Sequence, residues 1–148
     1  METKWLGIDY GSKRVGLAIS GALGFVHILP TFHRTKNLAE DLQRLKKLMQ
    51  QEAIQEIVIG FPKNMNNSVG FKAEEVLQFV EHLKQTIPFP VHLWDERLTT
   101  QQAQLMIQHL PEKNKKALVD SIAAKLILES FLDAQKNRKS QDIILQNE

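Results

Sequence analysis

The chain of 148 residues contains no cysteine, which excludes disulfide bonds and cysteine-ligated zinc sites. It also lacks any apolar run near the roughly 20 residues that a membrane-spanning helix needs. Its N-terminus has neither the basic start nor the long apolar stretch of a signal peptide. From these absences we expect a cytoplasmic protein that has no membrane partner.

Internal repeats, low-complexity segments and linkers are absent as well. Hydrophobic residues make up 43% of the chain and charged residues 24%, which is the balance of an ordinary globular domain. The net charge of +2 permits a polyanionic partner without requiring one. Two basic clusters are of a kind usually found on solvated surface: Lys113, Lys115 and Lys116, and Lys136, Arg138 and Lys139. We predict one domain over residues 1–148, with a mobile tail over residues 136–148.

The hydrophobic pattern predicts strands and helices that alternate along most of the chain. Strands are expected over residues 5–8, 15–19, 25–32, 56–60 and 90–94. Helices are expected over residues 38–49, 73–83, 103–110 and 117–134. Pro30 weakens the third strand, and Asn37 with Glu40 gives the first helix an N-terminal cap. This order predicts an α/β fold, a mixed sheet with helices packed on it.

Acidic residues stand where strands end. Asp9 follows the first strand and Asp95 follows the last, at the carboxyl ends where α/β sheets gather their ligand sites. Either residue could instead accept hydrogen bonds from turn amides. Asp120 shares a small, apolar face of the last helix with Ala123 and Ala124, which would let the helix approach the sheet closely. An ionised carboxylate there needs a cation nearby, although Asp120 could also cap the start of the helix.

Three acids near one sheet edge suit Mg²⁺, a hard cation that takes oxygen ligands. In a two-metal site the ions lie roughly 4 Å apart and stabilise the attacking and the leaving oxygens of an in-line displacement. The five histidines show no zinc-like spacing, and each is more typical of packing or surface. The acids therefore indicate phosphodiester hydrolysis.

The glycine-rich segment over residues 7–16 matches neither the Walker A motif nor the dinucleotide-binding motif. Its glycines favour a tight hairpin that brings Lys13 or Arg14 near a phosphate. The alternative is that the hairpin needs glycine for conformational reasons alone.

Four motifs occur in order along nearly the whole chain: residues 7–18 (GIDYGSKRVGLA), residues 59–62 (IGFP) with Asn64, Met65 and Ser68, residues 95–100 (DERLTT), and residues 119–121 (VDS). By these motifs the chain resembles the YqgF/RuvX family, ribonuclease H-like proteins described as pre-16S ribosomal RNA nucleases and relatives of Holliday junction resolvases. The resemblance implies a ribonuclease H-like mixed sheet of about five strands with helices packed on both faces.

The resemblance also implies a metal site that holds Mg²⁺ or Mn²⁺. Its ligands would come from Asp9, the pair Asp95 and Glu96, and Asp120, and the catalytic acids would be Asp9, Glu96 and Asp120. We favour Glu96 over Asp95 as the catalytic acid of the pair. Alternation puts these two residues on opposite faces of a strand, and the choice stays open because a loop begins there.

Six residues are implied to hold the nucleic-acid substrate: Lys13, Arg14, Asn64, Ser68, Arg97 and Lys116. Arg97 could instead pair with a neighbouring acid. The chain departs from the family at Asn66 and Asn67, where Asp-Gly is frequent, and at Ala117, where glycine is usual. These departures affect the expected handling of substrate and leave the acids untouched.

The implied function is a divalent-metal-dependent nuclease that processes the 5′ end of precursor 16S ribosomal RNA, with ribosomal particles as further partners. The alternative is a Holliday junction-resolving endonuclease, and the two related cuts in branched DNA would favour a symmetric dimer. A non-catalytic nucleic-acid-binding module is a second alternative, although acids repel a phosphate unless a metal neutralises them. An actin-like ATPase is disfavoured because it needs two such domains. The sequence leaves open whether the protein is a monomer or a homodimer.

Overall fold

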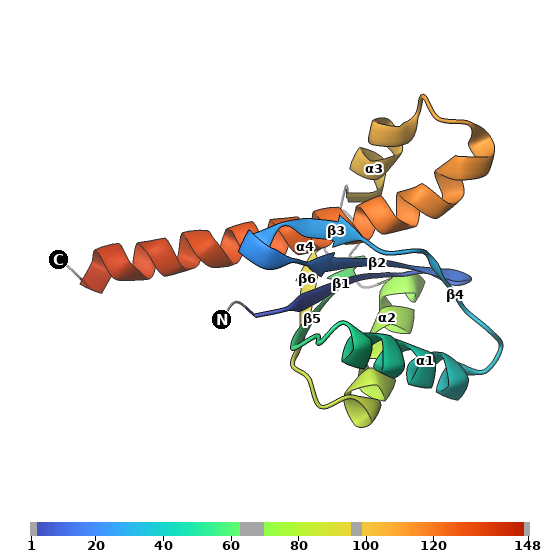
Figure 1. The fold of residues 1–148 in the computed structure, drawn as a ribbon, viewed down its shortest axis with the longest axis horizontal. Coiled ribbons are helices and arrows are strands. Elements are labelled where there is room, and N and C mark those ends of the chain that lie inside the picture. Colours follow the sequence, from blue (N-terminus) through green and yellow to red (C-terminus); the bar gives the residue numbers. More distant parts are fainter. Residues whose placement is uncertain (1–2, 63–69, 96–98, 147–148) are drawn as a thin grey trace.

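A mixed sheet of six strands lies at the centre of the computed structural model, which describes residues 3–62, 70–95 and 99–146 (Figure 1). The strands are β1 (Trp5–Tyr10), β2 (Arg14–Ser20), β3 (Val26–Ile28), β4 (Phe32–His33), β5 (Glu56–Phe61) and β6 (Val91–Asp95). Their order in the sheet is β3-β2-β1-β5-β6, and β4 also pairs with β2. β1 is antiparallel to β2 and parallel to β5, which is in turn parallel to β6. The carboxyl ends of β1, β5 and β6 therefore lie along the same edge of the sheet.

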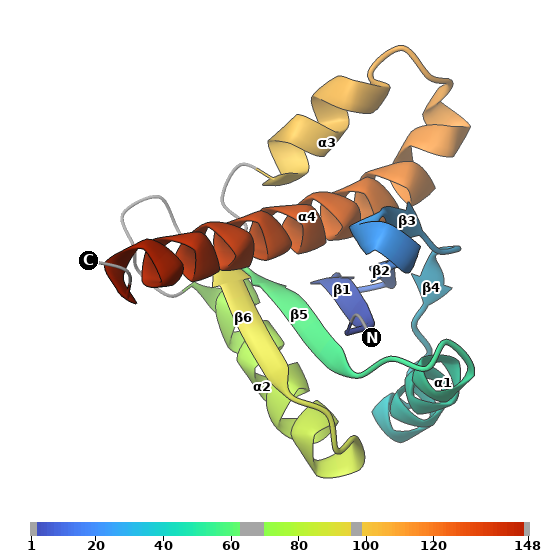
Figure 2. The same ribbon diagram turned by 60° about the vertical axis from the view of Figure 1, so that its left-hand side comes forward.

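Helices cover both faces of the sheet, as Figures 1 and 2 show. The helices are α1 (Leu38–Gln51), α2 (Phe71–Thr86), α3 (Thr99–Ile107) and α4 (Glu112–Gln146), and a short 3-10 helix, η1 (Ala22–Gly24), precedes β3. α1 and α2 lie on one face, α4 crosses the other, and α3 packs on the first half of α4. Among the described residues we find no helix with the length and apolar character to cross a membrane.

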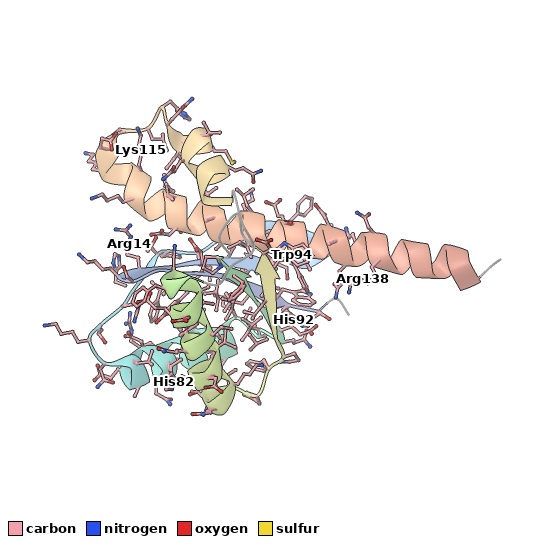
Figure 3. All side chains as sticks on the ribbon, turned by 180° about the vertical axis from the view of Figure 1, so that it is seen from behind. Arg14, His82, His92, Trp94, Lys115 and Arg138 are labelled. Carbon is pink, nitrogen blue, oxygen red and sulfur yellow. The ribbon has the colours of Figure 1, made fainter. Side chains whose placement is uncertain are left out.

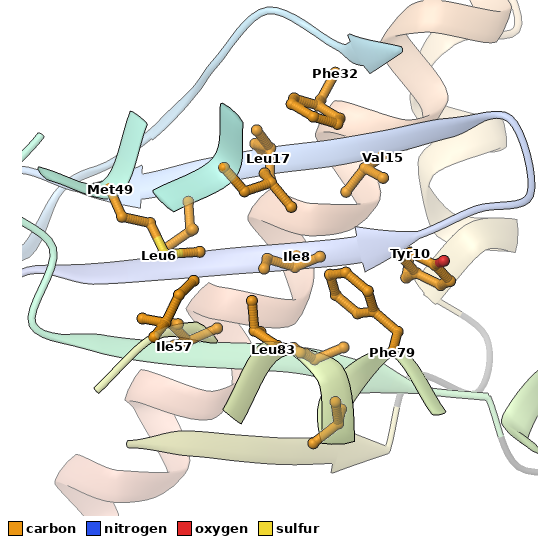
Figure 4. Close-up of a cluster of buried hydrophobic side chains, with 14 of the residues drawn as sticks. Leu6, Ile8, Tyr10, Val15, Leu17, Phe32, Met49, Ile57, Phe79 and Leu83 are labelled. Carbon is orange, nitrogen blue, oxygen red and sulfur yellow. The ribbon is translucent and has the colours of Figure 1, made fainter. Parts of the chain in front are cut away.

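Alternation along the strands gives each face its own apolar core. Leu6, Ile8 and Tyr10 of β1 pack with α1 and α2 in the larger core (Figure 4). Trp5 of the same strand packs with Ile127 of α4 in the smaller core. Odd-numbered residues of β1 therefore face α4, and even-numbered residues face α1 and α2.

Two glycines let α4 lie directly on the sheet. A Cβ atom at Gly16 would come within 1.9 Å of the carbonyl oxygen of Asp120, and one at Gly7 within 2.9 Å of the carbonyl oxygen of Ala124. A side chain at either position would displace the helix. Ala123 and Ala124 are fully buried on the helix side of this contact. The predicted small face beside Asp120 is thus confirmed.

The predicted order of strands and helices is confirmed, with differences in extent. The side chain of Asn37 accepts a hydrogen bond from the backbone amide of Glu40, as expected for the N-terminal cap of α1. The strand expected over residues 25–32 is split into β3 and β4. Pro30 lies at the break because it has no amide hydrogen for the ladder.

The last helix is longer than the predicted residues 117–134. It begins at Glu112 and continues to Gln146, and many of the added residues are lysine, glutamine and arginine, which have high helix propensity. The preceding helix lies earlier in the chain than the predicted residues 103–110: it begins at Thr99 and ends at Ile107. The mobility of the C-terminal tail stays a prediction.

Candidate active site

Asp9 lies near the carboxyl end of β1, on the face of the sheet that α4 covers. It is directly opposite Gly16 in the antiparallel pair of β1 and β2, and opposed residues of such a pair share a face. Since Gly16 lies against the backbone of Asp120, Asp9 and Asp120 are neighbours where the helix meets the sheet. Only 8% of Asp9 is exposed, so its ionised form needs polar or cationic partners.

Asp120 forms an ion pair with Arg14, the first residue of β2. The Nε of Arg14 donates to Oδ2 of Asp120 at 2.7 Å, and the side chains are 34% and 19% exposed, respectively. Arg14 and Gly16 are two residues apart on β2 and so share the α4 face. The structure thus brings together the predicted residues Asp9, Arg14 and Asp120, although 106 positions separate Arg14 from Asp120.

Asp95, the last residue of β6, lies on the other face of the sheet. It pairs with Phe61 of β5, and Phe61 packs against the larger core under α1 and α2. The preceding residue, Trp94, instead makes an edge contact with Phe131 of α4. This alternation separates Asp95 from Asp9, a geometry that does not favour the predicted role of Asp95 as a ligand beside Asp9.

Four predicted site residues fall outside the described part of the chain: Asn64, Ser68, Glu96 and Arg97. Within the described ranges, no group of three or more histidine or acidic side chains is arranged to hold a metal ion. Asp9 and Asp120 are two of the three predicted catalytic acids, and Glu96 is the third. Their roles as metal ligands stay predictions.

Arg34 holds the turn between β1 and β2, a role that was not predicted. Its Nη1 donates to the carbonyl oxygens of Gly11 at 2.8 Å and Ser12 at 2.9 Å, and its guanidinium lies 4.6 Å from the centroid of the Tyr10 ring. Its backbone amide donates to the carbonyl oxygen of Lys13. The exposed Lys13 side chain is therefore carried on a braced turn. No local sequence signal marks Arg34, because it lies 22 positions beyond Ser12.

Tyr10 belongs to the face of the sheet opposite to Asp9 and Asp120. Its ring stacks on Phe79 of α2, with the centroids 4.0 Å apart. Burial raises the pKa of the phenol, while the Arg34 cation lowers this pKa and the carboxylates of Glu75 and Asp41 raise it further. The phenol therefore stays protonated at neutral pH.

A groove of about 370 Å³ between α3 and α4 opens beside Arg14. Its lining residues are Arg14, Gln104, Ile107, Gln108, Glu112, Lys115, Lys116 and Val119. Figure 3 shows Arg14 and Lys115 near the same end of α4, far from Arg138. Lys116 was among the predicted substrate residues, whereas Lys115 was noted only as part of a basic cluster. The cluster was a usable signal, but the sequence did not show which surface it lines.

Comparison with known proteins places the chain in a family. The RuvX family model, described as a Holliday junction resolvase, matches residues 3–134. The chain belongs to the RuvX family. This RuvX chain is 45% identical over 131 residues to a Clostridium acetobutylicum protein named "Putative pre-16S rRNA nuclease", with 87% of this chain and 97% of that protein covered. A Thermoanaerobacter pseudethanolicus protein of the same name is 39% identical over 137 residues, with 90% and 98% covered.

Solved structures similar to this RuvX chain include that of Thermus thermophilus RuvC in complex with a Holliday junction substrate. The TM-score is 0.55 and the identity 14%, with 91% of this chain and 97% of that chain covered. A further Thermus thermophilus RuvC structure gives a TM-score of 0.52 at 14% identity, with 90% and 97% covered. This likeness concerns the fold, and it confirms the predicted ribonuclease H-like mixed sheet with helices on both faces.

The chemistry of the described acids fits a hard divalent cation. Asp9 and Asp120 offer carboxylate oxygens, which are the ligands that Mg²⁺ and Mn²⁺ prefer. The Arg14 guanidinium already places a positive charge at Oδ2 of Asp120. A metal ion bound there would compete with Arg14 for this oxygen.

Proposed function

We propose that this RuvX chain is a divalent-metal-dependent nuclease that hydrolyses phosphodiester bonds and processes the 5′ end of precursor 16S ribosomal RNA. The observation that carries the proposal is the convergence of Asp9, Asp120 and Arg14 on one face of the sheet. The names of the RuvX relatives support the choice of RNA. Ribosomal particles are the proposed further partners, because the substrate is a precursor of ribosomal RNA.

The proposed catalytic acids and ligands of Mg²⁺ or Mn²⁺ are Asp9, Glu96 and Asp120. When bound, the metal supplies an activated water and stabilises the leaving oxygen. Glu96 is preferred to Asp95 because of strand alternation. Asp95 lies on the face of α1 and α2, and the next residue of an extended strand would share the face of Asp9.

Basic side chains around the acids are proposed to hold the substrate phosphates. Arg14 orients Oδ2 of Asp120 through Nε, and its terminal guanidinium N–H groups are proposed to donate to a phosphate oxygen. Lys13 is exposed on the braced turn, and Lys116 is exposed near the start of α4. Three further proposed substrate contacts are Asn64, Ser68 and Arg97.

Cleavage of 5′-end fragments of precursor 16S ribosomal RNA by the purified full chain, with Mg²⁺ or Mn²⁺, tests the proposal. We expect Asp9→Asn, Glu96→Gln and Asp120→Asn each to lower the rate by about 10²-fold or more, because an amide is a poor substitute for a carboxylate in metal and water activation. Circular dichroism of each variant checks that it is folded.

Two matched variants sharpen this experiment. Asp133→Asn changes an exposed acid further along α4 and should keep the wild-type rate. Asp95→Asn distinguishes the role of Asp95 from that of Glu96. We expect the Asp95→Asn variant to cut RNA far faster than the Glu96→Gln variant. A wild-type protein that binds RNA but cuts neither RNA nor branched DNA with either metal would overturn the nuclease proposal in favour of a non-catalytic binding module.

A Holliday junction-resolving endonuclease is the second candidate. Its support is the description of the family model and the fold shared with RuvC. Paired, symmetric cuts in a four-way DNA junction, made by a protein that is a dimer in sedimentation analysis, would favour this candidate over the RNA nuclease.

A further inference from the structure

We propose that the groove between α3 and α4 binds the phosphodiester backbone of the substrate strand next to the cleaved bond. This inference rests on the proposed nuclease function and extends it from the acids to a neighbouring surface. The groove would hold a phosphate beside the scissile one, and its basic side chains would set the path along which the strand leaves the site.

The position of the groove is the first reason. Arg14 lines the groove and also donates to Oδ2 of Asp120 at 2.7 Å. A phosphate in the groove would therefore lie within the reach of a side chain that contacts a proposed catalytic acid. A strand that passes the acids is expected to continue into this groove.

The charge of the lining is the second reason. Arg14, Lys115 and Lys116 supply three cations, and Glu112 is the acid among the lining residues. Glu112 pairs with Nζ of Lys115 at 3.0 Å, but the Glu112 side chain is 89% exposed and can turn away into solvent. Such a cation excess attracts the phosphates of a nucleic acid.

The uncharged lining and the size of the groove are the third reason. Gln104 of α3 and Gln108, in the turn that follows this helix, are both exposed and both line the groove, so their amide groups can donate to phosphate or ribose oxygens. Ile107 and Val119 add apolar surface of the kind that packs under a sugar or a base.

The volume of the groove is about 370 Å³, near the lower end of the roughly 300–1,000 Å³ of small-ligand sites. A segment of the size of one nucleotide therefore suits the groove better than a protein segment.

Binding of a labelled, single-stranded RNA that spans the 5′ processing region tests the groove without cleavage. The full chain is titrated in EDTA, by fluorescence anisotropy, at several salt concentrations. We expect the double variant Lys115→Gln/Lys116→Gln to bind more weakly and to lower the slope of log K against log salt by about 1.4, which is roughly 0.7 for each lost phosphate contact. Gln108→Ala should weaken binding with little change in this slope, because it removes a neutral donor.

A second pair of adjacent lysines provides the matched control. Lys46→Gln/Lys47→Gln removes the same charge from α1, which lies on the far side of the sheet (Figure 1). This control should keep the wild-type salt slope. If the groove variant and this control give equal affinity and slope, the proposal is wrong. Equal competition by a polyglutamate peptide of the same charge as the RNA would also overturn it, because the groove would then select acidic peptides as readily as phosphates.

Kinetics separate this inference from the proposed function. If the chain is a nuclease, the groove variant should raise KM for RNA and leave kcat at saturation within about twofold, since only binding energy is lost. If the wild-type protein cuts neither substrate yet binds RNA through Lys115 and Lys116, the nuclease proposal is wrong and the groove proposal stands. If the chain is an active nuclease and the substitution of Lys115 and Lys116 changes neither its RNA affinity nor its KM, the groove proposal is wrong and the nuclease proposal stands.

Discussion

Arg14 serves both the acids and the groove, and at the scale of single residues it is the side chain that links them. In the structure its guanidinium neutralises Asp120, and both side chains are partly exposed. The pair is therefore worth little as a stabilising contact, on the order of 1 kcal/mol or less. The pair matters because of where the positive charge lies. The Arg14 guanidinium is beside the carboxylate of Asp120, the proposed metal ligand, which needs a cation nearby.

We expect Arg14→Gln to tighten the binding of Mn²⁺ by about fivefold, because the variant removes a cation that competes for Oδ2 of Asp120. The factor corresponds to roughly 1 kcal/mol for a partly exposed pair. Isothermal titration calorimetry in the absence of nucleic acid measures the Mn²⁺ affinity of the wild type and the variant. Arg44→Gln is the matched control, since its partner, Asp41, belongs to α1. Equal Mn²⁺ affinity in wild type and Arg14→Gln would contradict the assignment of Asp120 as a ligand.

At the scale of elements, the contact between α4 and the sheet sets the geometry of the site. Gly16 is the neighbour of Asp9 across the β1–β2 pair, and its missing side chain is the space in which the Asp120 backbone lies. The same close approach brings Arg14 within hydrogen-bond distance of Asp120. The relative positions of Asp9, Arg14 and Asp120 therefore depend on the distance between α4 and the sheet at Gly16.

Gly16→Ala is expected to lower the free energy of unfolding by about 3 kcal/mol, the upper part of the range for overpacking, because the added Cβ would overlap the Asp120 carbonyl. Urea denaturation measures this change. Gly21→Ala is the matched control: its Cβ would meet mainly the end of the flexible His27 side chain, so we expect a loss below about 1 kcal/mol. Equal losses in the two variants would show that α4 does not press on the sheet at Gly16.

At the scale of the whole molecule, α4 is longer than the sheet that it covers. Figure 1 shows its C-terminal end projecting beyond the strands. Phe131 and Leu132 are the last residues of α4 that pack against the smaller core. Among the residues of α4 whose side chains the structure describes, those after Leu132 belong to neither apolar core.

We expect a chain that ends at Arg138 to keep its free energy of unfolding within about 0.5 kcal/mol, because the C-terminal end of α4 projects beyond the strands (Figure 1). Urea denaturation followed by fluorescence of Trp5 and Trp94 measures this, and circular dichroism should show the lost helix. Leu128→Ala is the contrast within the same helix. Leu128 is fully buried, and its truncation should cost about 2–5 kcal/mol. A large loss from the shortened chain would mean that the tail packs on the domain.

Much of the fold was predictable because its signals are local. The cap at Asn37 needs only the next few residues of backbone, and the position of Asp9 after an apolar run needs only the strand that precedes it. The break at Pro30 follows from the chemistry of one residue. The small face beside Asp120 follows from helical spacing of alanines.

The contacts of the candidate site were less predictable because they join distant segments. The hydrogen bonds from Arg34 to the turn between β1 and β2 depend on where the chain passes after β4. The groove residue Lys115 looked like ordinary charged surface until α3 and Arg14 were placed beside it. The face of Asp95 depends on the register of β6 against β5.

The sequence by itself determined the α/β pattern, the ordered motifs of the RuvX family and the residue types that suit a metal-dependent nuclease. These properties reside in local propensity, periodicity and spacing. Only the tertiary structure decided that Arg14 pairs with Asp120, that Asp95 lies on the face opposite to Asp9, and that a basic groove adjoins the acids. The physical reason is that strand register and helix approach fix which side chains meet, and both depend on packing across the whole sheet.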